Sequence, residues 1–432
     1  MRADNRRLSL TGSVALGTGV MIGAGIFALV GQVAEFAGSA VPWAFLAAAV
    51  VVALSSYSYI SYSSTNPSSG GIAMLLKAAY GPGVIAGTFS LFMYVSMVLA
   101  EGLLARTFGT YLLRPFDMQD SAVWVAALAV AAIIAAATVN LVGNAAVESS
   151  ATATALVKLI GIAVLAVAGI AATGLSSFSR LFTGDSQTSS SHGWLGFLAG
   201  VALCILAYKG FTTITNQGDD VRDPQRNIAR SIVIAIGVCT LLYLLLAVAV
   251  TGSLSVPEIL RARDYALAEA AAPLFGPVGV WLTVGIAIVA TVSGLVASLF
   301  AVSRLYDMLR HMGQVPGLPG GVSRQSLLIT SALAIGTATA FDLGQIAALG
   351  AMLYLSMDIA IHWGMVRHLR DDVEITPWVP SVAIALDLLV LVPFVVMVSR
   401  TDPLTLTITV AVAVVIAVAQ WVTVRHRGRA RR

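Results

Sequence analysis

Charged residues are scarce in this chain. They make up only 11% of the 432 residues, and hydrophobic residues make up 58%. A soluble domain usually carries about 25% charged residues. This supply is too small to build a water-facing surface, which excludes an ordinary soluble enzyme or binding domain. The sequence therefore predicts a protein whose surface faces mostly lipid.

Cysteine is almost missing as well. The two cysteines, Cys204 and Cys239, both lie inside apolar runs. Such a pattern excludes a disulfide framework and predicts buried packing residues. The basic start of the chain runs into an apolar segment too long for a cleavable signal peptide. The first span is therefore expected to stay in the protein as an anchor.

Catalytic and metal-binding patterns are also missing. The sequence has no Ser–His arrangement, no phosphate loop and no paired acids at a plausible catalytic depth. The five histidines show no metal-ligand spacing, so no metal site and no cofactor are predicted. Rings of pore-lining charge, which a channel needs, are absent too. A membrane enzyme or a channel remains the alternative from another class.

Long apolar runs are abundant instead. A bilayer core needs about 20 apolar residues per helix, and twelve segments meet this need. They cover residues 10–32, 42–63, 83–113, 122–142, 146–173, 194–216, 228–252, 277–306, 326–341, 343–364, 378–399 and 403–424.

The basic residues orient these spans. Of the 25 Lys and Arg residues, seventeen fall on one side of the twelve spans, five on the other and three inside spans. Because the cytoplasmic side carries the excess of basic residues, both termini are predicted to be cytoplasmic. The basic tail 425–432 is expected to contact an anionic leaflet and not nucleic acid. The composition of the spans favours a bacterial inner membrane.

Two spans contain features that an anchor does not need. Residues 17–27 of the first span are rich in glycine, and residues 207–211 of the sixth hold Lys209 beside Gly210. A glycine-rich stretch alone can be a packing seam, but interrupted helices at matching places in two halves indicate a transport site. Broken helices offer N–H groups to a carboxylate and carbonyls to an ammonium. Both poles together suit an α-amino acid.

At these residues the chain resembles the amino acid–polyamine–organocation superfamily. The motifs are Gly23–Phe27, the loop 53–71 with Pro67 to Gly71, residues 207–228, and Ser303–Arg304 with Gly313 and Pro316. The resemblance implies one all-α transmembrane domain over residues 1–432, with a five-plus-five inverted repeat as in a bacterial leucine transporter. The repeats would cover residues 1–175 and 194–370, with two extra helices over 378–424.

The resemblance also implies a binding site. Amides around Ala24, Gly25 and Ile26 would hold a carboxylate, and carbonyls of both breaks would hold the amino group. The residues carried over are Met21, Ile22, Gly23, Ala24, Gly25, Ile26, Leu206, Ala207, Tyr208, Lys209 and Gly210.

Lys158 resembles a fifth-span lysine that takes the place of a sodium ion in sodium-coupled relatives. It is expected to contact the first span between Gly19 and Ile22. It would either exchange a proton during transport or act as a permanently charged strut. Both readings argue against sodium dependence.

Some residues depart from the superfamily pattern. Leu206 stands where many members have an aromatic gate, and the second-span stretch 55–60 lacks an acidic residue. Lys209 replaces a small or apolar residue, and its charge would disfavour cationic substrates if it faces the cavity.

Further charges lie inside the spans. Glu101 needs a partner in the membrane, and Lys209 or Arg106 could supply it, as a structural ion pair or in a substrate or proton role. Asp358 and Asp387 are interpreted as satisfied interior groups, with Asp358 near an outer pathway.

The sequence thus predicts a secondary active amino-acid transporter, driven by a proton gradient or by a counter-substrate. The alternative substrate is an organic amine or carboxylate.

Overall fold

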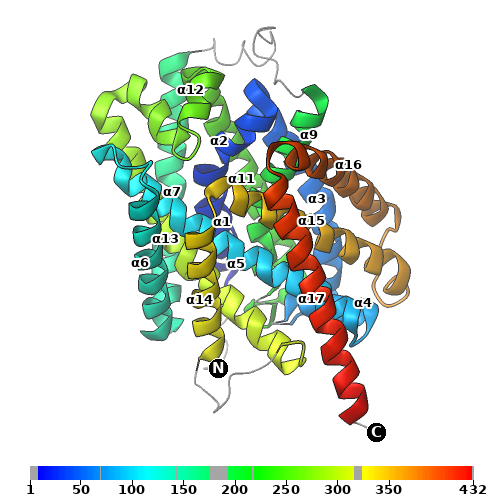
Figure 1. Ribbon diagram of the computed structural model, residues 1–432. Helices are drawn as coiled ribbons and strands as arrows, with labels where there is room; N and C mark the ends of the chain where they lie inside the picture. Colours follow the sequence, from blue (N-terminus) through cyan, green and yellow to red (C-terminus); the bar gives the residue numbers. More distant parts are fainter. Residues whose placement is uncertain are drawn as a thin grey trace.

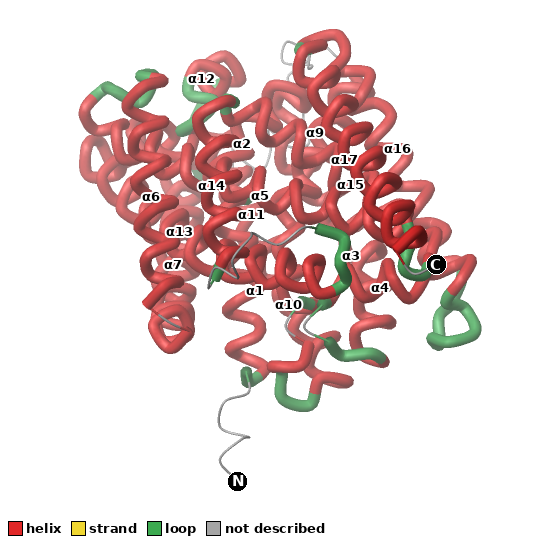
Figure 2. Tube along the Cα trace, turned by 60° about the horizontal axis from the view of Figure 1, so that its bottom comes forward, coloured by secondary structure: helices red, strands yellow, loops and turns green. Residues whose placement is uncertain are grey.

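The chain forms an almost entirely helical bundle (Figure 1; Figure 2, helices in red). The computed structural model describes residues 8–68, 70–142, 144–174, 193–216, 218–315 and 324–430. Arg2, Arg6 and Arg7, the loop residues Ser69 and Pro316, and the last two arginines of the basic tail lie outside these ranges. Within them, every regular element is a helix, apart from one isolated bridge between Leu8 and Val221. The prediction of an all-α membrane protein is confirmed.

The first half of the chain contains one broken span and four continuous ones. The elements are α1 (Leu10–Ala24), α2 (Ile26–Ala37), α3 (Val41–Thr65), α4 (Gly71–Tyr80), α5 (Val84–Leu113), α6 (Ala122–Val142) and α7 (Asn144–Thr173). The helices α1 and α2 together form the predicted first span, and they are separated only by Gly25.

The second half begins with the other broken span. Its elements are α9 (Gly193–Tyr208), the 3₁₀ turn η4 (Lys209–Phe211), α10 (Thr212–Thr215), α11 (Pro224–Ser253), α12 (Val256–Arg261), α13 (Ala266–His311), α14 (Gln325–Ala340), α15 (Leu343–His368), α16 (Trp378–Thr401) and α17 (Pro403–Ala430). The helix α13 kinks at Gly276, whose φ of 58° favours glycine. The predicted eighth span starts one residue after this kink.

The span prediction agrees with these helices. In the described ranges, ten segments are long and apolar enough to cross a membrane, and the first of them, Ile26–Thr65, contains both α2 and α3. The shorter apolar helices Leu10–Gly23 and Gln325–Ala340 complete the first and ninth predicted spans. The ten-residue helix α4 was not predicted, because its length is too short to count as a span.

The broken spans lie inside the bundle, and the helices around them face outward. Figure 1 shows α6 at one side of the bundle and α17 across its front, whereas residues 17–23 of α1 and all residues of α10 are buried. Many large apolar side chains on α17 are exposed, among them Val410, Val414, Val415 and Val418. An apolar surface of this kind suits contact with lipid. The break residues, in contrast, are buried on all sides.

Polar contacts close the bundle at both ends. At the end where α1 begins and α17 ends (Figure 1), the Leu8 amide donates to the Asp220 carbonyl (2.7 Å) and the Arg222 amide donates to the Leu8 carbonyl (2.9 Å). Arg304 also pairs with the Asp220 carboxylate at 2.7 Å. We call this set the terminal closure.

The other set of contacts joins α2 to the connection between α12 and α13. Arg263 pairs with Glu35 at 2.9 Å, and Gln32 donates to Asp264 at 2.7 Å. We call this set the distal closure. Both closures hold the first span against elements of the second half of the chain.

Candidate functional site

The two helix breaks touch each other. A β-carbon added to Gly210 would lie 2.6 Å from the backbone nitrogen of Met21. Only glycine therefore allows the two spans to approach so closely. The structure brings together most of the residues that the sequence named as substrate-binding, and all of these are buried: Met21, Ile22, Gly23, Gly25, Ile26, Leu206, Ala207, Tyr208, Lys209 and Gly210. Ala24 ends α1, and its side chain lies outside the described part.

The breaks are narrower than the sequence suggested. The expected unwinding would free a row of amides in the first span, but Gly25 donates its N–H to the Met21 carbonyl at 2.8 Å. The sixth span departs from the α-helix for only one 3₁₀ turn, at η4. The Gly25 amide is therefore not free to bind a carboxylate in this conformation. Only Gly25 separates α1 from α2, so the hydrogen bond from its amide to the Met21 carbonyl still forms as it would in a continuous helix.

Tyr243 of α11 bridges the two breaks. Its hydroxyl lies 2.6 Å from the Met21 carbonyl and 3.3 Å from the Ala207 carbonyl. These two carbonyls were expected to hold a substrate amino group. Sequence reasoning missed Tyr243, because a tyrosine in an apolar span gives no sign of which helices it will contact.

Hydroxyls donate to two further carbonyls of the sixth-span break. Thr212 donates to the Lys209 carbonyl at 2.8 Å, and Thr213 donates to the Gly210 carbonyl at 2.7 Å. Each bond spans three residues and fastens the 3₁₀ turn to α10. The carbonyls of Met21, Ala207, Lys209 and Gly210 are thus already within hydrogen-bond distance of a hydroxyl in this conformation.

Lys158 of α7 connects three spans. Its ammonium donates to the Gly19 carbonyl of α1 and to the Ser293 hydroxyl of α13, both at 2.9 Å. The residue is only 2% exposed. A single cation therefore holds the first, fifth and eighth spans together just before the first break.

Lys209 and Glu101 lie near each other without a close ion pair. Lys209 donates to the carbonyl and the hydroxyl of Ser96, at 2.7 and 2.9 Å. Neither carboxylate oxygen of Glu101 has a hydrogen-bond partner within the described ranges. Arg106 was the other candidate partner for Glu101, and this hypothesis is wrong, because Arg106 donates to the Ala338 carbonyl at 2.9 Å. Its guanidinium is drawn toward α14 and away from the middle of α5.

A small cavity adjoins the sixth-span break. Lys209 and the hydroxyl residues Thr212, Thr213 and Ser298 are its polar lining, and the rest of its wall is apolar or glycine. Lys209 therefore borders this cavity, while its ammonium is bonded to Ser96. A pocket with apolar walls and a few placed polar groups is typical of a small-molecule site.

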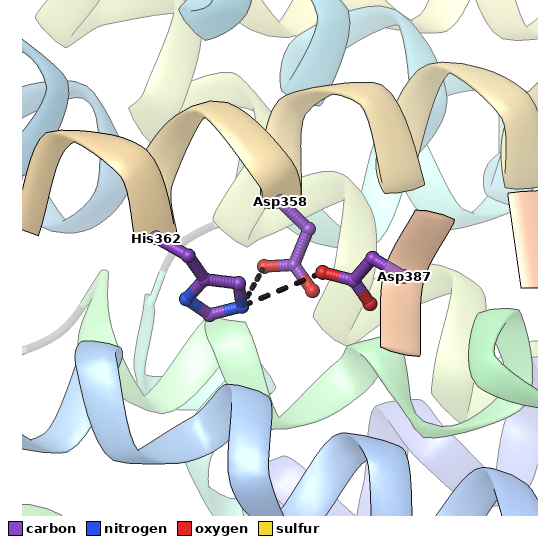
Figure 3. A group of neighbouring side chains, drawn as sticks. All are labelled: Asp358, His362 and Asp387. Carbon is purple, nitrogen blue, oxygen red and sulfur yellow. Dashed lines mark ion pairs between the residues drawn. The ribbon is translucent and has the colours of Figure 1, made fainter. Parts of the chain in front are cut away.

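A second group of buried charges lies away from the breaks (Figure 3). Asp358 and His362 of α15 meet Asp387 of α16, and no side chain of the three is more than 1% exposed. Asp358 accepts hydrogen bonds from Ser55 (2.8 Å) and Tyr59 (2.5 Å) of α3. Its carboxylate is thus enclosed by α3, α15 and α16 in this conformation, instead of bordering an open outer pathway.

His362 was assigned to no site from the sequence. His362 follows Asp358 by four residues, which places both side chains on one face of α15. This spacing could have indicated from the sequence that the two residues lie together. Asp387 could not be joined to them by spacing, because it comes from another helix.

Comparison with known proteins agrees with this architecture. A family model described as "Amino acid permease" matches residues 8–419. The chain is 31% identical to the inner membrane transport protein YbaT of Escherichia coli, over 90% of each chain. It is 30% identical to the vacuolar cationic amino acid transporter 4 of Arabidopsis thaliana, over 89% of this chain and 63% of that one.

Two further matches extend the comparison. A methylthioribose transporter of Bacillus subtilis is 26% identical over 88% of this chain and 86% of its own. A crystal structure of a manganese transporter mutant from Eremococcus coleocola has the same fold, with a TM-score of 0.56 over 96% of this chain at 11% identity. The resemblance to the amino acid–polyamine–organocation superfamily is confirmed, and the chain belongs to the amino acid permease family.

Proposed function

We propose that this multi-pass membrane permease is a secondary active transporter of an α-amino acid. The observation that supports the proposal most is the contact between the two broken spans, where Gly210 lies against the backbone of Met21. Transport sites of this architecture form where two interrupted helices meet near the middle of the membrane. The substrate would bind there, and the closures at the two ends would open in turn.

The chemistry of the breaks favours a zwitterion. The Tyr243 hydroxyl lies within hydrogen-bond distance of the Met21 and Ala207 carbonyls. A substrate ammonium would take over these acceptors when the site opens, since a charged donor makes a stronger bond than a hydroxyl. The start of α2 has the positive end of a helix dipole, which favours a carboxylate. The ammonium of Lys209 beside the cavity would disfavour a cationic side chain.

We further propose that transport is coupled to protons and independent of sodium, or that the protein exchanges one amino acid for another. Lys158 supports this proposal, because its ammonium already supplies a positive charge to the Gly19 carbonyl and the Ser293 hydroxyl. The excess of basic residues on one side of the spans supports an inner-membrane protein with both termini in the cytoplasm.

Uptake into liposomes tests the function. Purified protein is reconstituted, and a panel of labelled amino acids is offered with and without an inward proton gradient, in sodium and in choline buffer. We expect a zwitterionic amino acid to accumulate only with the gradient, or to exchange without it, equally in both buffers. If no amino acid is taken up or exchanged, the amino-acid assignment is overturned.

An organic amine or carboxylate is the second candidate substrate, and the relative named a methylthioribose transporter supports testing beyond amino acids. The same liposomes are then offered these compounds. Each lacks one pole of the zwitterion and would leave part of the broken-helix site unpaired.

A further inference from the structure

The buried group formed by Asp358, His362 and Asp387 has no role in the site at the helix breaks. We call it the Asp–His–Asp cluster. Figure 3 shows the imidazole of His362 directed at both carboxylates. Its Nε2 atom lies 3.5 Å from an Asp358 oxygen and 3.6 Å from an Asp387 oxygen. Both distances are too long for ordinary hydrogen bonds.

The atoms that face the centre of the cluster are unpaired. Nε2 of His362 and both carboxylate oxygens of Asp387 are buried without a hydrogen-bond partner in the part of the chain that the structure describes. Asp358 differs, because Ser55 and Tyr59 donate to its two oxygens. Both oxygens of Asp358 therefore have a hydrogen-bond donor, whereas Nε2 of His362 and the carboxylate of Asp387 have no partner within the described ranges.

Charge balance requires a cation at this place. With a neutral imidazole the cluster carries two negative charges, and no lysine or arginine forms an ion pair with either aspartate within the described ranges. Two uncompensated carboxylates in a buried, apolar environment are very unfavourable. Ionisable residues inside a membrane bundle commonly mark proton pathways.

We propose that the Asp–His–Asp cluster is a proton-binding site. One proton from water adds to the lone pair of His362 Nε2, forms an N–H bond and reduces the net charge from −2 to −1. A second proton adds to a carboxylate oxygen of Asp387, forms an O–H bond and makes the cluster neutral. Release returns both protons to water, and no other group is consumed.

The geometry favours protons over a metal ion. Nδ1 of His362 lies 2.8 Å from the Ser58 hydroxyl. When Nδ1 carries the ring proton and donates to Ser58, Nε2 turns its lone pair toward two carboxylates, and a proton there relieves this repulsion. A hydrated metal ion would have to shed its water and enter a group that is at most 1% exposed. Protons can reach such a group along hydrogen-bonded side chains.

The cluster also contacts the sixth-span break. The Tyr59 hydroxyl donates to Asp358, and the Tyr59 ring packs edge-on against Phe211 of η4, with 5.3 Å between centroids. On the same side, the Lys209 ammonium lies 5.9 Å from the centre of the Tyr354 ring. Because both contacts end at η4, a change of charge in the cluster is expected to shift the position of this turn.

Within the described ranges, two tyrosines act directly on the cluster. Tyr59 of α3 and Tyr354 of α15 interact electrostatically with the aspartates. The neighbouring helices carry further titratable residues, among them Tyr57 and Tyr62 of α3, Cys204 and Tyr208 of α9, Lys77 and Tyr80 of α4, and Glu101 of α5. Three of them are directed elsewhere: Tyr208 donates to the Phe45 carbonyl, Tyr80 donates to the Ala360 carbonyl, and Glu101 lies beside Lys209.

Infrared spectroscopy tests proton binding without any substrate. Full-length protein in lipid vesicles is titrated with acid, and the C=O stretching band of a protonated carboxylic acid is followed. We expect a band that disappears in Asp387→Asn and changes its midpoint in His362→Gln. Asp371→Asn, which removes an exposed carboxylate after α15, serves as the matched control and should keep the band. A band that neither cluster variant alters overturns the proposal.

Measurement of the metal content of the purified protein tests the alternative that the cluster binds a metal ion. One metal ion per wild-type chain that is lost in both His362→Gln and Asp387→Asn would show that the cation is a metal ion, and would overturn the proposal. We expect no metal at that stoichiometry in protein purified without chelator. Two variants are used so that a folding defect in one leaves the other to decide.

Transport tests whether the cluster is coupled to the substrate, and this arm rests on the proposed function. We expect both cluster variants to lose at least about tenfold in gradient-driven accumulation while they keep exchange at equal pH on both sides. His368→Gln, an exposed histidine that contacts the Tyr80 ring, is the control. Equal loss of accumulation and exchange would overturn the coupling. A wild type that moves no amino acid contradicts the proposed function alone, and the infrared bands still decide on proton binding.

Discussion

Removal of the Lys158 ammonium is the most direct perturbation of the candidate coupling site. We expect Lys158→Met, which keeps the length of the side chain, to abolish gradient-driven accumulation while exchange persists. In the variant, the Gly19 carbonyl and the Ser293 hydroxyl both lose the donor that lies 2.9 Å away. The first span is then no longer fastened to the fifth and the eighth.

The magnitude follows from these two bonds. A hydrogen bond to a charged group contributes about 1.5–3 kcal/mol, so the two together contribute roughly 3–6 kcal/mol. Loss of the buried ammonium removes its desolvation cost and offsets part of this sum. A net effect of about 1–3 kcal/mol corresponds to a roughly 5- to 150-fold change in the balance of conformations.

The assay compares uptake with and without an inward proton gradient, and exchange at equal pH, in the same vesicles. Lys77→Ala on α4 is the control for the loss of a lysine outside this contact. Lys158→Arg separates the two readings, because arginine stays charged in proteins. A proton-carrying Lys158 predicts that Arg keeps exchange and loses coupling. Gradient-driven accumulation at the wild-type level in Lys158→Met would refute the reasoning.

Three further changes test the site. Lys209→Met removes the positive charge beside the cavity, so cationic amino acids should compete about tenfold better for uptake. This corresponds to a change of about 1.4 kcal/mol in binding free energy. An unchanged competition profile would contradict the prediction. Tyr243→Phe removes the hydroxyl that bridges the two breaks. Loss of this hydrogen bond, at about 0.5–1.5 kcal/mol, should slow uptake up to about tenfold at saturating substrate. Gly210→Ala places a β-carbon 2.6 Å from the Met21 nitrogen and should abolish uptake, whereas Gly237→Ala, which meets open space, should leave uptake and melting temperature unchanged.

Apolar length was enough to predict the spans. Twelve segments were named from the sequence, and each of them lies on helical elements. The bounds of α6 (Ala122–Val142) match the prediction, whereas α13 extends beyond the predicted eighth span and the first and sixth spans are divided. The membrane imposes this regularity, because every backbone group in lipid must be hydrogen-bonded within a helix. The helix α4 escaped this reasoning, since ten residues cannot cross the bilayer.

The sequence predicted where the candidate site lies but not which side chains pair with its backbone. Glycines near residue 25 and near Gly210 indicated where the helices break, but glycine content does not say how far a helix unwinds. The bridge from Tyr243 depends on α11 lying against both breaks, which no local pattern encodes. The partner of Arg106 likewise came from α14, a helix far along the chain.

Distance in the sequence also hid the Asp–His–Asp cluster. His362 and Asp358 share a face of α15 and could have been paired from their spacing. Asp387 stands on the next helix, and only the contact between α15 and α16 brings its carboxylate to within 3.6 Å of the imidazole. Buried charges on different helices therefore need the tertiary structure to find their partners.

The terminal closure has a mechanical consequence. The Leu8 amide and carbonyl are both hydrogen-bonded, to the backbones of Asp220 and Arg222. The start of the first span and the loop after the sixth are therefore expected to move together on that face. For either broken helix to move away from the other on that face, these two hydrogen bonds must first break. A spectroscopic label on the Leu8 segment would therefore report the opening of the terminal closure. A bulky fusion at the same place would hinder this opening.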